Sequence, residues 1–300
     1  MDRKFKINGD DFFTTFVIKA LNDIWGNTRN NVFPGSQPVT FERKNFEKLS
    51  NYSYYMSKRT DGIRCILYFM TDNEGQNRSI LINKDLKVFD ISLDAHDSVY
   101  TGTVFDGEIH LDDNSFVIHD SPMICGVKIN KNNLYDRMCD ISYCVDKISH
   151  IEDLCVYVKK FYHVSEMYSF KNDNHGDSGI IFVPESIPVI SGVQYSMFTW
   201  RPVKNYTFNF MVCEDNNDII VKACSNGKII DYAKIRHPCE FIGTLKALDN
   251  YSDSCIVECS YINDTFLPIM IRDDKTHPNS LRTIQRTLFN IHENITLDEF

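Results

Sequence analysis

The sequence predicts an α+β protein that ends in a small β-barrel of the OB type. Near the N-terminus, apolar residues recur at helical spacing from Asp10 to Trp25, which predicts an amphipathic helix. The middle of the chain carries apolar runs separated by turn residues, as in strands: 80–91, 101–110 and 116–120. From about residue 210 five short runs follow one another, which favours a five-stranded barrel: 208–213, 219–224, 228–233, 240–248 and 254–261.

The composition is that of a globular protein. Hydrophobic residues make up 43% of the 300 residues and charged residues 24%, which is ordinary for a chain that folds around a core. No apolar run approaches the roughly 18 residues that span a bilayer. Residues 1–6 lack the apolar core of a signal peptide. We therefore expect no membrane association and an intracellular location.

Charge and cysteines narrow the function further. A formal net charge of −9 disfavours a protein that holds duplex nucleic acid along its length, because such proteins present a basic surface. Any RNA contact is therefore expected to be local. The ten cysteines are scattered, and the nearest pairs, Cys139/Cys144 and Cys255/Cys259, have no partner pair at zinc-site spacing. Free, buried thiols in a reducing compartment are the expectation.

The stretch from Tyr55 to Tyr68 is the most informative part of the chain. It is apolar at both ends, which predicts a strand, a tight turn at Asp61-Gly62 and a second strand. Three cations accompany the turn: Lys58, Arg59 and Arg64. They could present positive charge to a phosphate, and the alternative is the solvated tip of a hairpin.

Residues Ser57 to Arg64 resemble the nucleotidyl-transfer motif of eukaryotic and viral mRNA capping guanylyltransferases, Ser-x-Lys-Thr-Asp-Gly-x-Arg. In that family the motif lysine attacks the α-phosphate of GTP and carries GMP covalently. Arg59 holds the position of that lysine here, and Lys58 lies one residue earlier. Phe33 to Val39, Phe-Pro-Gly-Ser-Gln-Pro-Val, is similar to the segment that precedes the motif in many members of the family.

The next motif of the family is Asp106-Gly107-Glu108. The resemblance implies that Glu108 faces the nucleotide and could hold Mg²⁺ or Mn²⁺, and the alternative is a plain Asp-Gly turn. His119 stands where the family has an aromatic residue that stacks on guanine, and the alternative is a core histidine with satisfied hydrogen bonds. Arg137 also falls where the family carries an arginine.

Two later motifs depart from the family pattern. Residues 174–183 resemble His-Gly-x-Asp-Gly-Leu-Ile-Phe, but Ser178 replaces the acid before the glycine and Asp177 is displaced by one position. Residues 197–202 resemble Leu-Leu-Lys-Trp-Lys-Pro, with Thr199 and Arg201 in place of the two lysines. Downstream, Asn209 replaces an acid.

The last motif is the best matched. Residues 271–279 carry Arg-x-Asp-Lys followed by Pro-Asn, and the resemblance implies that Arg272, Asp274 and Lys275 orient the β- and γ-phosphates. Ser280 then caps a predicted amphipathic helix over 281–291.

The resemblance implies a two-domain nucleotidyltransferase fold with antiparallel sheets. We expect the nucleotidyltransferase-like domain at 1–208, the OB domain at 209–280, and a C-terminal helix, 281–300, that packs back on the body. The implied ligands are GTP, a cap-like nucleotide and an RNA 5′ end. The implied partners are subunits of a capping or transcription complex, in the nucleus or the cytoplasm, and a viral origin fits the family as well.

The activity depends on Arg59. Lysine is a nucleophile because its amine can lose a proton, whereas an arginine guanidinium stays charged in proteins. The sequence therefore predicts an impaired or inactive member that binds GTP, a capped 5′ end or a partner protein. The alternative is an active guanylyltransferase that uses Lys58.

Five cations stand at positions that the family directs toward phosphates: Arg59, Arg64, Arg201, Arg272 and Lys275. The prediction is that they bind a nucleotide phosphate. The alternative is that they only neutralise nearby carboxylates, namely Asp61, Asp106, Glu108 and Asp274.

Overall fold

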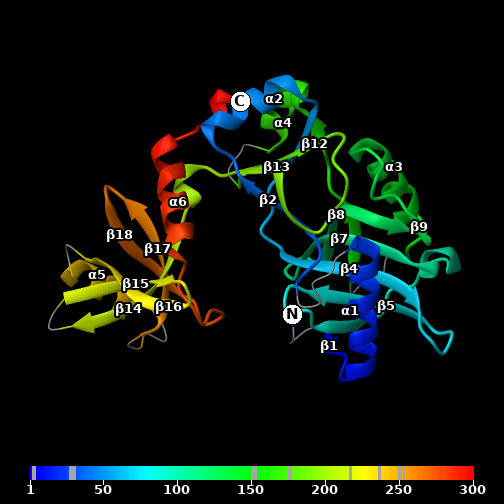
Figure 1. The fold of residues 1–300 in the computed structure, drawn as a ribbon, viewed down its shortest axis with the longest axis horizontal. Helices are drawn as coiled ribbons and strands as arrows, with labels where there is room; N and C mark the ends of the chain where they lie inside the picture. The colour runs from blue at the N-terminus through cyan, green and yellow to red at the C-terminus, as the bar shows by residue number, and fades with distance from the viewer. Residues whose placement is uncertain are drawn as a thin grey trace. The chain divides into compact units, whose positions relative to one another are not determined.

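The structure is a computed structural model that describes residues 1, 5–26, 32–149, 154–174, 178–215, 218–235, 238–248, 252 and 254–300. It divides into two compact units, Met1–Trp200 and Arg201–Phe300, each with its own sheet system and core (Figure 1). No helix in these residues is long and apolar enough to cross a membrane.

The larger sheet of the first unit is mostly antiparallel, in the order β1-β6-β5-β4-β7-β8-β10, with β9 paired to β8. Among the strand pairs that the described residues form in it, only β8–β10 is parallel. Its strands are β1 (Lys6–Ile7), β4 (Ile63–Thr71), β5 (Asn77–Asn83), β6 (Val88–Ile91), β7 (Thr103–His110), β8 (Ser115–Ile124), β9 (Val127–Lys128) and β10 (Cys155–Val158).

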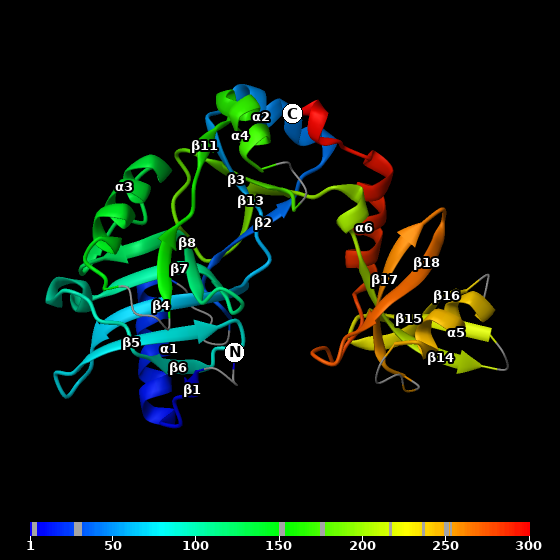
Figure 2. The same cartoon turned by 180° about the vertical axis from the view of Figure 1, so that it is seen from behind.

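Both faces of this sheet are covered by helices because side chains alternate along each strand. In β4, Ile66 and Tyr68 belong to one core cluster with Val17 and Leu21 of α1 (Asp11–Trp25). The intervening β4 residues belong to a second cluster with Ile141 of α3 (Leu134–Val145) and its neighbours. Figures 1 and 2 accordingly show α1 in front of the sheet in one view and behind it in the other.

The smaller sheet of the first unit has the order β11-β3-β12-β13-β2. Its strands are β2 (Ser36–Thr40), β3 (Tyr54–Lys58), β11 (Tyr162–His163), β12 (Ile180–Pro184) and β13 (Gly192–Trp200). The short helices α2 (Phe46–Asn51) and α4 (Met167–Asn174) accompany it. Phe41, Phe182 and Phe198 form an aromatic cluster in its core.

The predicted hairpin at Asp61-Gly62 is wrong, because β3 and β4 belong to different sheets. β3 pairs with β11 and β12, while β4 pairs with β5 and β7. Residues 59–62 are instead a short crossing from one sheet to the other. Gly62 lacks a positive φ in this structure. The backbone N–H of Arg59 extends the pairing of β3 with β12 by one residue, donating to Gly179 O at 3.0 Å.

A second short crossing, residues 159–161, connects β10 of the larger sheet to β11 of the smaller one. The two crossings are joined by hydrogen bonds. Ser57 Oγ donates to Lys160 O at 2.8 Å, and Lys159 Nζ donates to Thr60 Oγ1 at 2.8 Å. The edge at which the two sheets meet is therefore fixed by the chain and by side chains.

One further strand prediction needs correction in the first unit. The predicted strand over 80–91 is the hairpin of β5 and β6, because Asn83 caps a turn with its side chain, accepting from the N–H groups of Asp85 and Lys87. The alternative of a plain Asp-Gly turn at Asp106-Gly107 is wrong, since both residues lie inside β7, within the strand predicted over 101–110.

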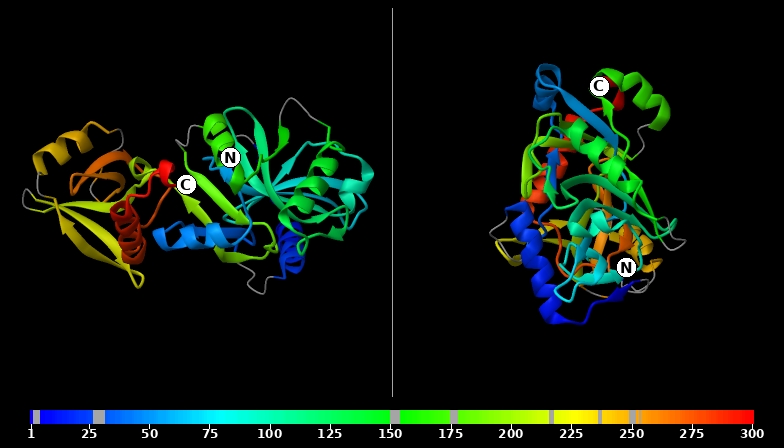
Figure 3. Two further views of the ribbon diagram at one scale, coloured as in Figure 1. Left: turned by 90° about the horizontal axis from the view of Figure 1, so that it is seen from above. Right: turned by 90° about the vertical axis from the view of Figure 1, so that its right-hand side faces the viewer.

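The second unit is a five-stranded antiparallel sheet in the order β16-β15-β14-β17-β18. Its strands are β14 (Phe208–Asp215), β15 (Asp218–Ser225), β16 (Lys228–Lys234), β17 (Ile256–Ile262) and β18 (Thr265–Ile271). Alternate residues of β14 and β15 are buried with Phe241 and Leu245 of α5 (Pro238–Lys246) and Ile284 of α6 (Leu281–Glu293). Figure 3 shows α6, in red, beside the strands of its own unit.

The α+β class with mostly antiparallel strands is confirmed, and Ser280 caps α6 as predicted, accepting from Thr283 N. The strand predicted over 240–248 is wrong: Phe241 and Leu245 are spaced by one helical turn, and the segment is α5. The fifth strand is β18, which Pro268 restricts to a sheet edge. Among the described residues no pairing joins β16 to β18, so the barrel is not closed.

Candidate functional site

The central strands of the larger sheet place three charged residues on one face. Arg64 of β4 lies opposite Glu108 of β7 in the register, and Asp106 is two residues before Glu108 on the same face. Gly107 lies between the two acids, and a Cβ there would come within 2.3 Å of Val117 O. The glycine of the Asp-Gly-Glu motif is thus required by the close approach of β8.

Arg64 is held by Asp106. Its Nε and Nη2 donate to the two Asp106 carboxylate oxygens at 3.0 and 2.6 Å, a paired arrangement that fixes the guanidinium plane. Gly35 and Phe33 of the Phe-Pro-Gly loop cover this pair. A Cβ on Gly35 would lie 2.7 Å from Arg64 Nη2, and the Phe33 ring stands 5.7 Å from the guanidinium carbon. The loop's sequence therefore fits its contact with the ion pair.

Glu108 is the centre of a polar cluster. His110 Nε2, His119 Nε2 and Lys159 Nζ lie 3.3, 3.4 and 3.7 Å from Glu108 Oε1. Burial by itself raises the pKa of Glu108, but the hydrogen bond from His119 and the neighbouring positive charge of Lys159 outweigh it and bring the pKa down to about 2. The carboxylate is thus ionised at any physiological pH.

The resemblance suggested Glu108 as a ligand of a divalent cation. Its neighbours are two imidazole rings and the ammonium group of Lys159, and the positive charge of that ammonium disfavours a metal ion at the same carboxylate oxygen. Among the residues that the structure describes, no group of three or more His, Cys, Asp or Glu side chains could hold a metal. The side chains around Glu108 therefore do not fit a protein-held metal, and a divalent cation would have to arrive with the phosphates of a nucleotide.

Lys159, which the sequence analysis did not single out, is the buried lysine of the cluster. Its side chain is 6% exposed, and Nζ lies 2.8 Å from Thr60 Oγ1 and 3.3 Å from His119 Nε2. Burial lowers the pKa of Lys159; Glu108 opposes this effect, and the charge of Arg59 adds to it. The alternation of residues 155–159, which puts Tyr157 and Lys159 on one face, was the available signal.

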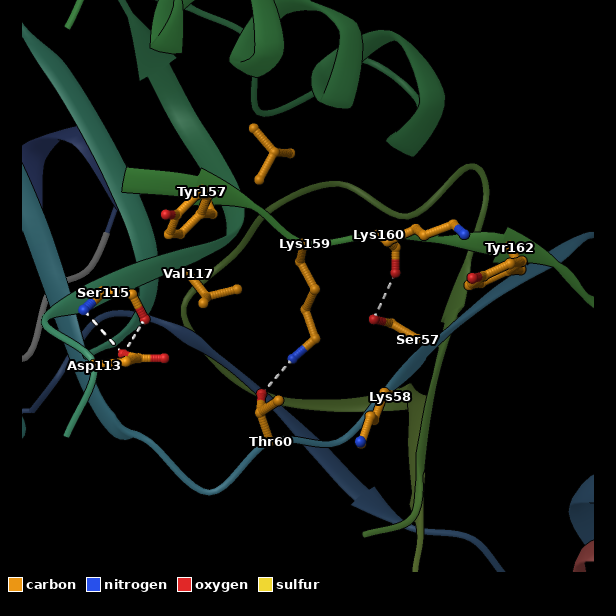
Figure 4. Close-up of a pocket in the computed structure, with 11 residues that line it drawn as sticks. Ser57, Lys58, Thr60, Asp113, Ser115, Val117, Tyr157, Lys159, Lys160 and Tyr162 are labelled. Atoms are coloured by element: carbon orange, nitrogen blue, oxygen red, sulfur yellow. Dashed lines mark hydrogen bonds between the residues drawn. The ribbon is translucent and has the colours of Figure 1, made fainter. Parts of the chain in front are cut away.

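A pocket opens beside this cluster and is lined by both sheets of the first unit. Figure 4 shows Lys159, the residue after β10, reaching across it to Thr60. Its residues are Ser57, Lys58, Thr60, Asp113, Ser115, Val117, Tyr157, Val158, Lys159, Lys160 and Tyr162. Asp113 is engaged by Ser115, whose hydroxyl donates to it at 2.6 Å.

Arg59, at the position of the family's lysine, and Lys58, one residue earlier, have different surroundings. Arg59 is paired with its neighbour Asp61, with Nη1 2.5 Å from Oδ1. Lys58, at the end of β3, is exposed and lines the pocket.

The remaining predicted residues are distributed over both units. Thr199 lies in β13, where its carbonyl accepts from Phe41 N at 2.8 Å. Ser178 follows α4 and is half-buried, whereas Asp177 lies outside the described residues. Arg201 is the first residue of the second unit.

In the second unit Arg272 forms ion pairs with two carboxylates, those of Glu258 and Asp274. Its Nη1 lies 2.6 Å from Glu258, and its Nε and Nη2 lie 2.8 and 2.7 Å from the Asp274 oxygens. These contacts raise the pKa of Arg272 and lower that of Asp274. Burial lowers the pKa of Lys275, which is half-buried. Asn279 is a structural tie, because its side chain accepts from Asn209 N at 2.7 Å.

Carboxylate neutralisation, the alternative for the five cations, therefore holds for three of them in the structure: Arg59 with Asp61, Arg64 with Asp106, and Arg272 with Asp274. These pairs do not exclude phosphate binding, but a phosphate would have to share or displace a carboxylate.

Arg137 has a structural role that its sequence position alone did not indicate. It is fully buried in α3, and its Nε and Nη2 donate to Asp120 of β8, each at 2.8 Å. Its Nη1 donates to the carbonyls of Asn132 and Ile187 at 2.5 and 2.9 Å. Arg137 thus joins α3 to β8 at Asp120, the residue that follows His119.

Two protein-family models match the chain. They are the mRNA capping enzyme, catalytic domain, over residues 14–203 and the mRNA capping enzyme, C-terminal domain, over residues 204–300. The mRNA-capping enzyme subunit alpha of Schizosaccharomyces pombe is 23% identical over 322 residues, covering 91% of this chain and 80% of that protein. The same subunit of Yarrowia lipolytica is 26% identical over 319 residues, covering 88% of this chain and 80% of that protein.

Among solved structures, the ATP-dependent DNA ligase of bacteriophage T7 in complex with ATP has a TM-score of 0.43 and 10% identity to this chain. The similarity covers 79% of this chain and 98% of the ligase.

Proposed function

Because the chain belongs to the mRNA capping enzyme family, we propose that its first unit binds a guanosine nucleotide, either GTP or the capped 5′ end of an RNA, and that Arg59 forms no covalent intermediate with it. The chain is then an impaired member of the family at the position where its relatives are expected to carry the nucleophile. Its setting is the formation of the mRNA 5′ cap.

The charge of the pocket carries this proposal. Three lysines, Lys58, Lys159 and Lys160, line a pocket whose lining acid, Asp113, already accepts from Ser115. The amine of Lys160 is engaged by Asp173, so Lys58 and Lys159 are the two that can meet a ligand. An ammonium group donates charge-assisted hydrogen bonds to phosphate. The pocket thus carries positive charge in a chain whose net charge is −9, which favours an anionic ligand.

Arg59 supports the second half of the proposal. A guanidinium cannot be deprotonated in a protein, so it has no free electron pair for attack on phosphorus. Its ion pair with Asp61 also holds it in place. Lys58, the alternative nucleophile, is exposed at the end of β3.

Partner chains belong to the proposal as well. The relatives in S. pombe and Y. lipolytica are named as alpha subunits of capping enzymes, which supports a role for this chain beside other subunits of a capping or transcription complex.

Calorimetric titration of the intact chain with GTP, a cap analogue and ATP, each with Mg²⁺, tests the proposal. We expect a dissociation constant for GTP between micromolar and millimolar, as two or three charged contacts would give after association entropy. Lys159→Met should weaken binding roughly tenfold or more, the worth of one charge-assisted hydrogen bond. Lys128→Met, on β9 away from the pocket, is the control. No heat with any of the three ligands at millimolar concentration would refute the proposal.

A further inference from the structure

We propose that the outer face of α6 binds single-stranded RNA, as a second contact for a strand whose 5′ end enters the pocket of the first unit. This outer face consists of Arg282, Gln285, Arg286 and Phe289. The inference rests on the proposed role of the chain at an RNA 5′ end and extends it, because an RNA carries further nucleotides behind the terminal one.

The sequence of α6 separates a core face from the outer face. Ile284 and Leu288 lie one helical turn apart and pack into the core of the second unit. The residues of the outer face also recur at spacings of three and four, on the opposite side of the helix, and all of them are exposed. Phe289, with 51% of its surface exposed, is a large apolar side chain that this fold leaves in water.

The two arginines of the outer face are available to a ligand. Within the part of the chain that the structure describes, neither Arg282 nor Arg286 forms an ion pair or a side-chain hydrogen bond. Arg272 of the same unit differs, because it pairs with Glu258 and Asp274. An unpaired guanidinium can donate two parallel hydrogen bonds to a phosphate without displacing a carboxylate.

Helix stability does not account for the charge at Arg282. This arginine is the second residue of α6, and the first turn of the helix contains no acid. A cation at this end opposes the helix dipole, whose N-terminal end is positive. The side chain therefore weakens the helix slightly, and an anionic ligand favours its presence there.

The aromatic ring distinguishes RNA from other anionic partners. Arg282 and Arg286 are separated by about 6 Å along the helix axis, so they can meet neighbouring phosphates of one strand. Phe289 lies three residues further, where its ring offers a face for a base to stack on. An acidic protein would engage the arginines alone, whereas a single strand uses both the charges and the ring. The face ends at Glu293, an acid that is half-buried and has other contacts.

The start of α6 is held on the sheet of its own unit. Cys224 N of β15 donates to Asn279 O at 3.0 Å, and the Asn279 side chain accepts from Asn209 N at 2.7 Å. Figures 1 and 2 both show α6 beside the strands of this unit. The outer face is thus presented from a fixed support, which reduces the entropy lost on binding.

The test is fluorescence anisotropy of the intact chain with a short, unstructured capped RNA that carries a fluorophore at its 3′ end. We expect the RNA to bind more tightly than a cap analogue. Arg282→Gln/Arg286→Gln should weaken RNA binding tenfold or more and make the salt dependence shallower by about 1.4, at about 0.7 for each lost phosphate contact. Phe289→Leu should weaken it roughly fivefold or more by removing the stacking face.

Matched variants separate a local contact from a change in total charge. Lys228→Gln/Lys246→Gln removes two exposed cations from β16 and α5 of the same unit, and it should bind the RNA as wild type does. Arg282→Lys/Arg286→Lys keeps both charges and should retain most of the salt dependence. Calorimetry with GTP should give the same dissociation constant for all of these variants, which shows that they fold.

The outcomes distinguish this inference from the proposed function. An RNA that binds no more tightly than the cap analogue, or equally well to wild type and to Arg282→Gln/Arg286→Gln, overturns the inference and leaves GTP binding standing. Equal weakening in the Lys228→Gln/Lys246→Gln control also overturns it. Polyglutamate that binds as tightly as the RNA and is lost in the same variant would assign the face to acidic proteins instead. RNA binding that depends on this face, without any heat from GTP, would refute the proposed function alone.

Discussion

Replacing Arg137 with Met should destabilise the first unit strongly. The Arg137 side chain is fully buried, and it makes two hydrogen bonds to Asp120 and two to backbone carbonyls. Removal of one partner of a buried ion pair costs about 3 to 5 kcal/mol, because the other charge stays behind without compensation. Asp120 is 19% exposed, so water recovers part of that cost and we expect about 3 kcal/mol.

For a unit of this size that loss corresponds to a fall in Tm of roughly 6 to 12 °C. Calorimetric unfolding of wild type, Arg137→Met and the double variant Arg137→Met/Asp120→Asn measures it. The double variant should recover part of the loss, because an amide is cheaper to bury than a carboxylate. Lys160→Met, which breaks an exposed pair with Asp173, is the control and should change stability by less than about 1 kcal/mol. A change below about 1 kcal/mol in Arg137→Met would refute this reasoning.

Three further predictions concern single positions. Gly107→Ala should cost about 3 kcal/mol in chemical denaturation, because its Cβ meets Val117 O at 2.3 Å, and an unchanged midpoint would show that β8 can move away. Ser280→Ala should cost about 1 kcal/mol by removing the cap of α6, whereas Ser280→Asp should retain most of the stability. The pKa of Glu108 is about 2 in the folded chain against 4.5 unfolded, so its contribution is complete above about pH 4.5 and is lost as pH falls toward 2. Acid unfolding should therefore show a stability gap between wild type and Glu108→Gln that shrinks by about 3 kcal/mol across that window, and a constant gap would contradict the low pKa.

The sequence predicted local structure best where one element determined the pattern. The periodicity of α1 and the cap at Ser280 are local, and both were predicted correctly. The hairpin at Asp61-Gly62 failed because apolar–turn–apolar patterning cannot show whether two strands pair with each other or with partners far away in the chain. The strand over 240–248 failed because a short apolar run fits either period.

The candidate site was predictable only in part for the same reason. Resemblance directed attention to Arg59, Glu108 and His119 by their place in motifs. Lys159 belongs to no such motif, and only the parallel pairing of β10 with β8 brings it to Glu108. The sequence also could not show which carboxylates pair with the arginines, since Arg64 and its partner Asp106 are 42 residues apart.

The two short crossings between the sheets have a mechanical consequence. Residues 59–62 can extend over roughly 17 Å at most between the ends of β3 and β4, and residues 159–161 run beside them, joined through Thr60 and Ser57. The two sheets are thus joined along one edge, which contains Arg59, Thr60 and Lys159. Any change in the angle between the two sheets must therefore move the residues far from this edge most and those at the edge least. Side chains at this edge, which the hydrogen bonds of Ser57 and Thr60 tie together, therefore keep their mutual distances when the angle between the sheets changes.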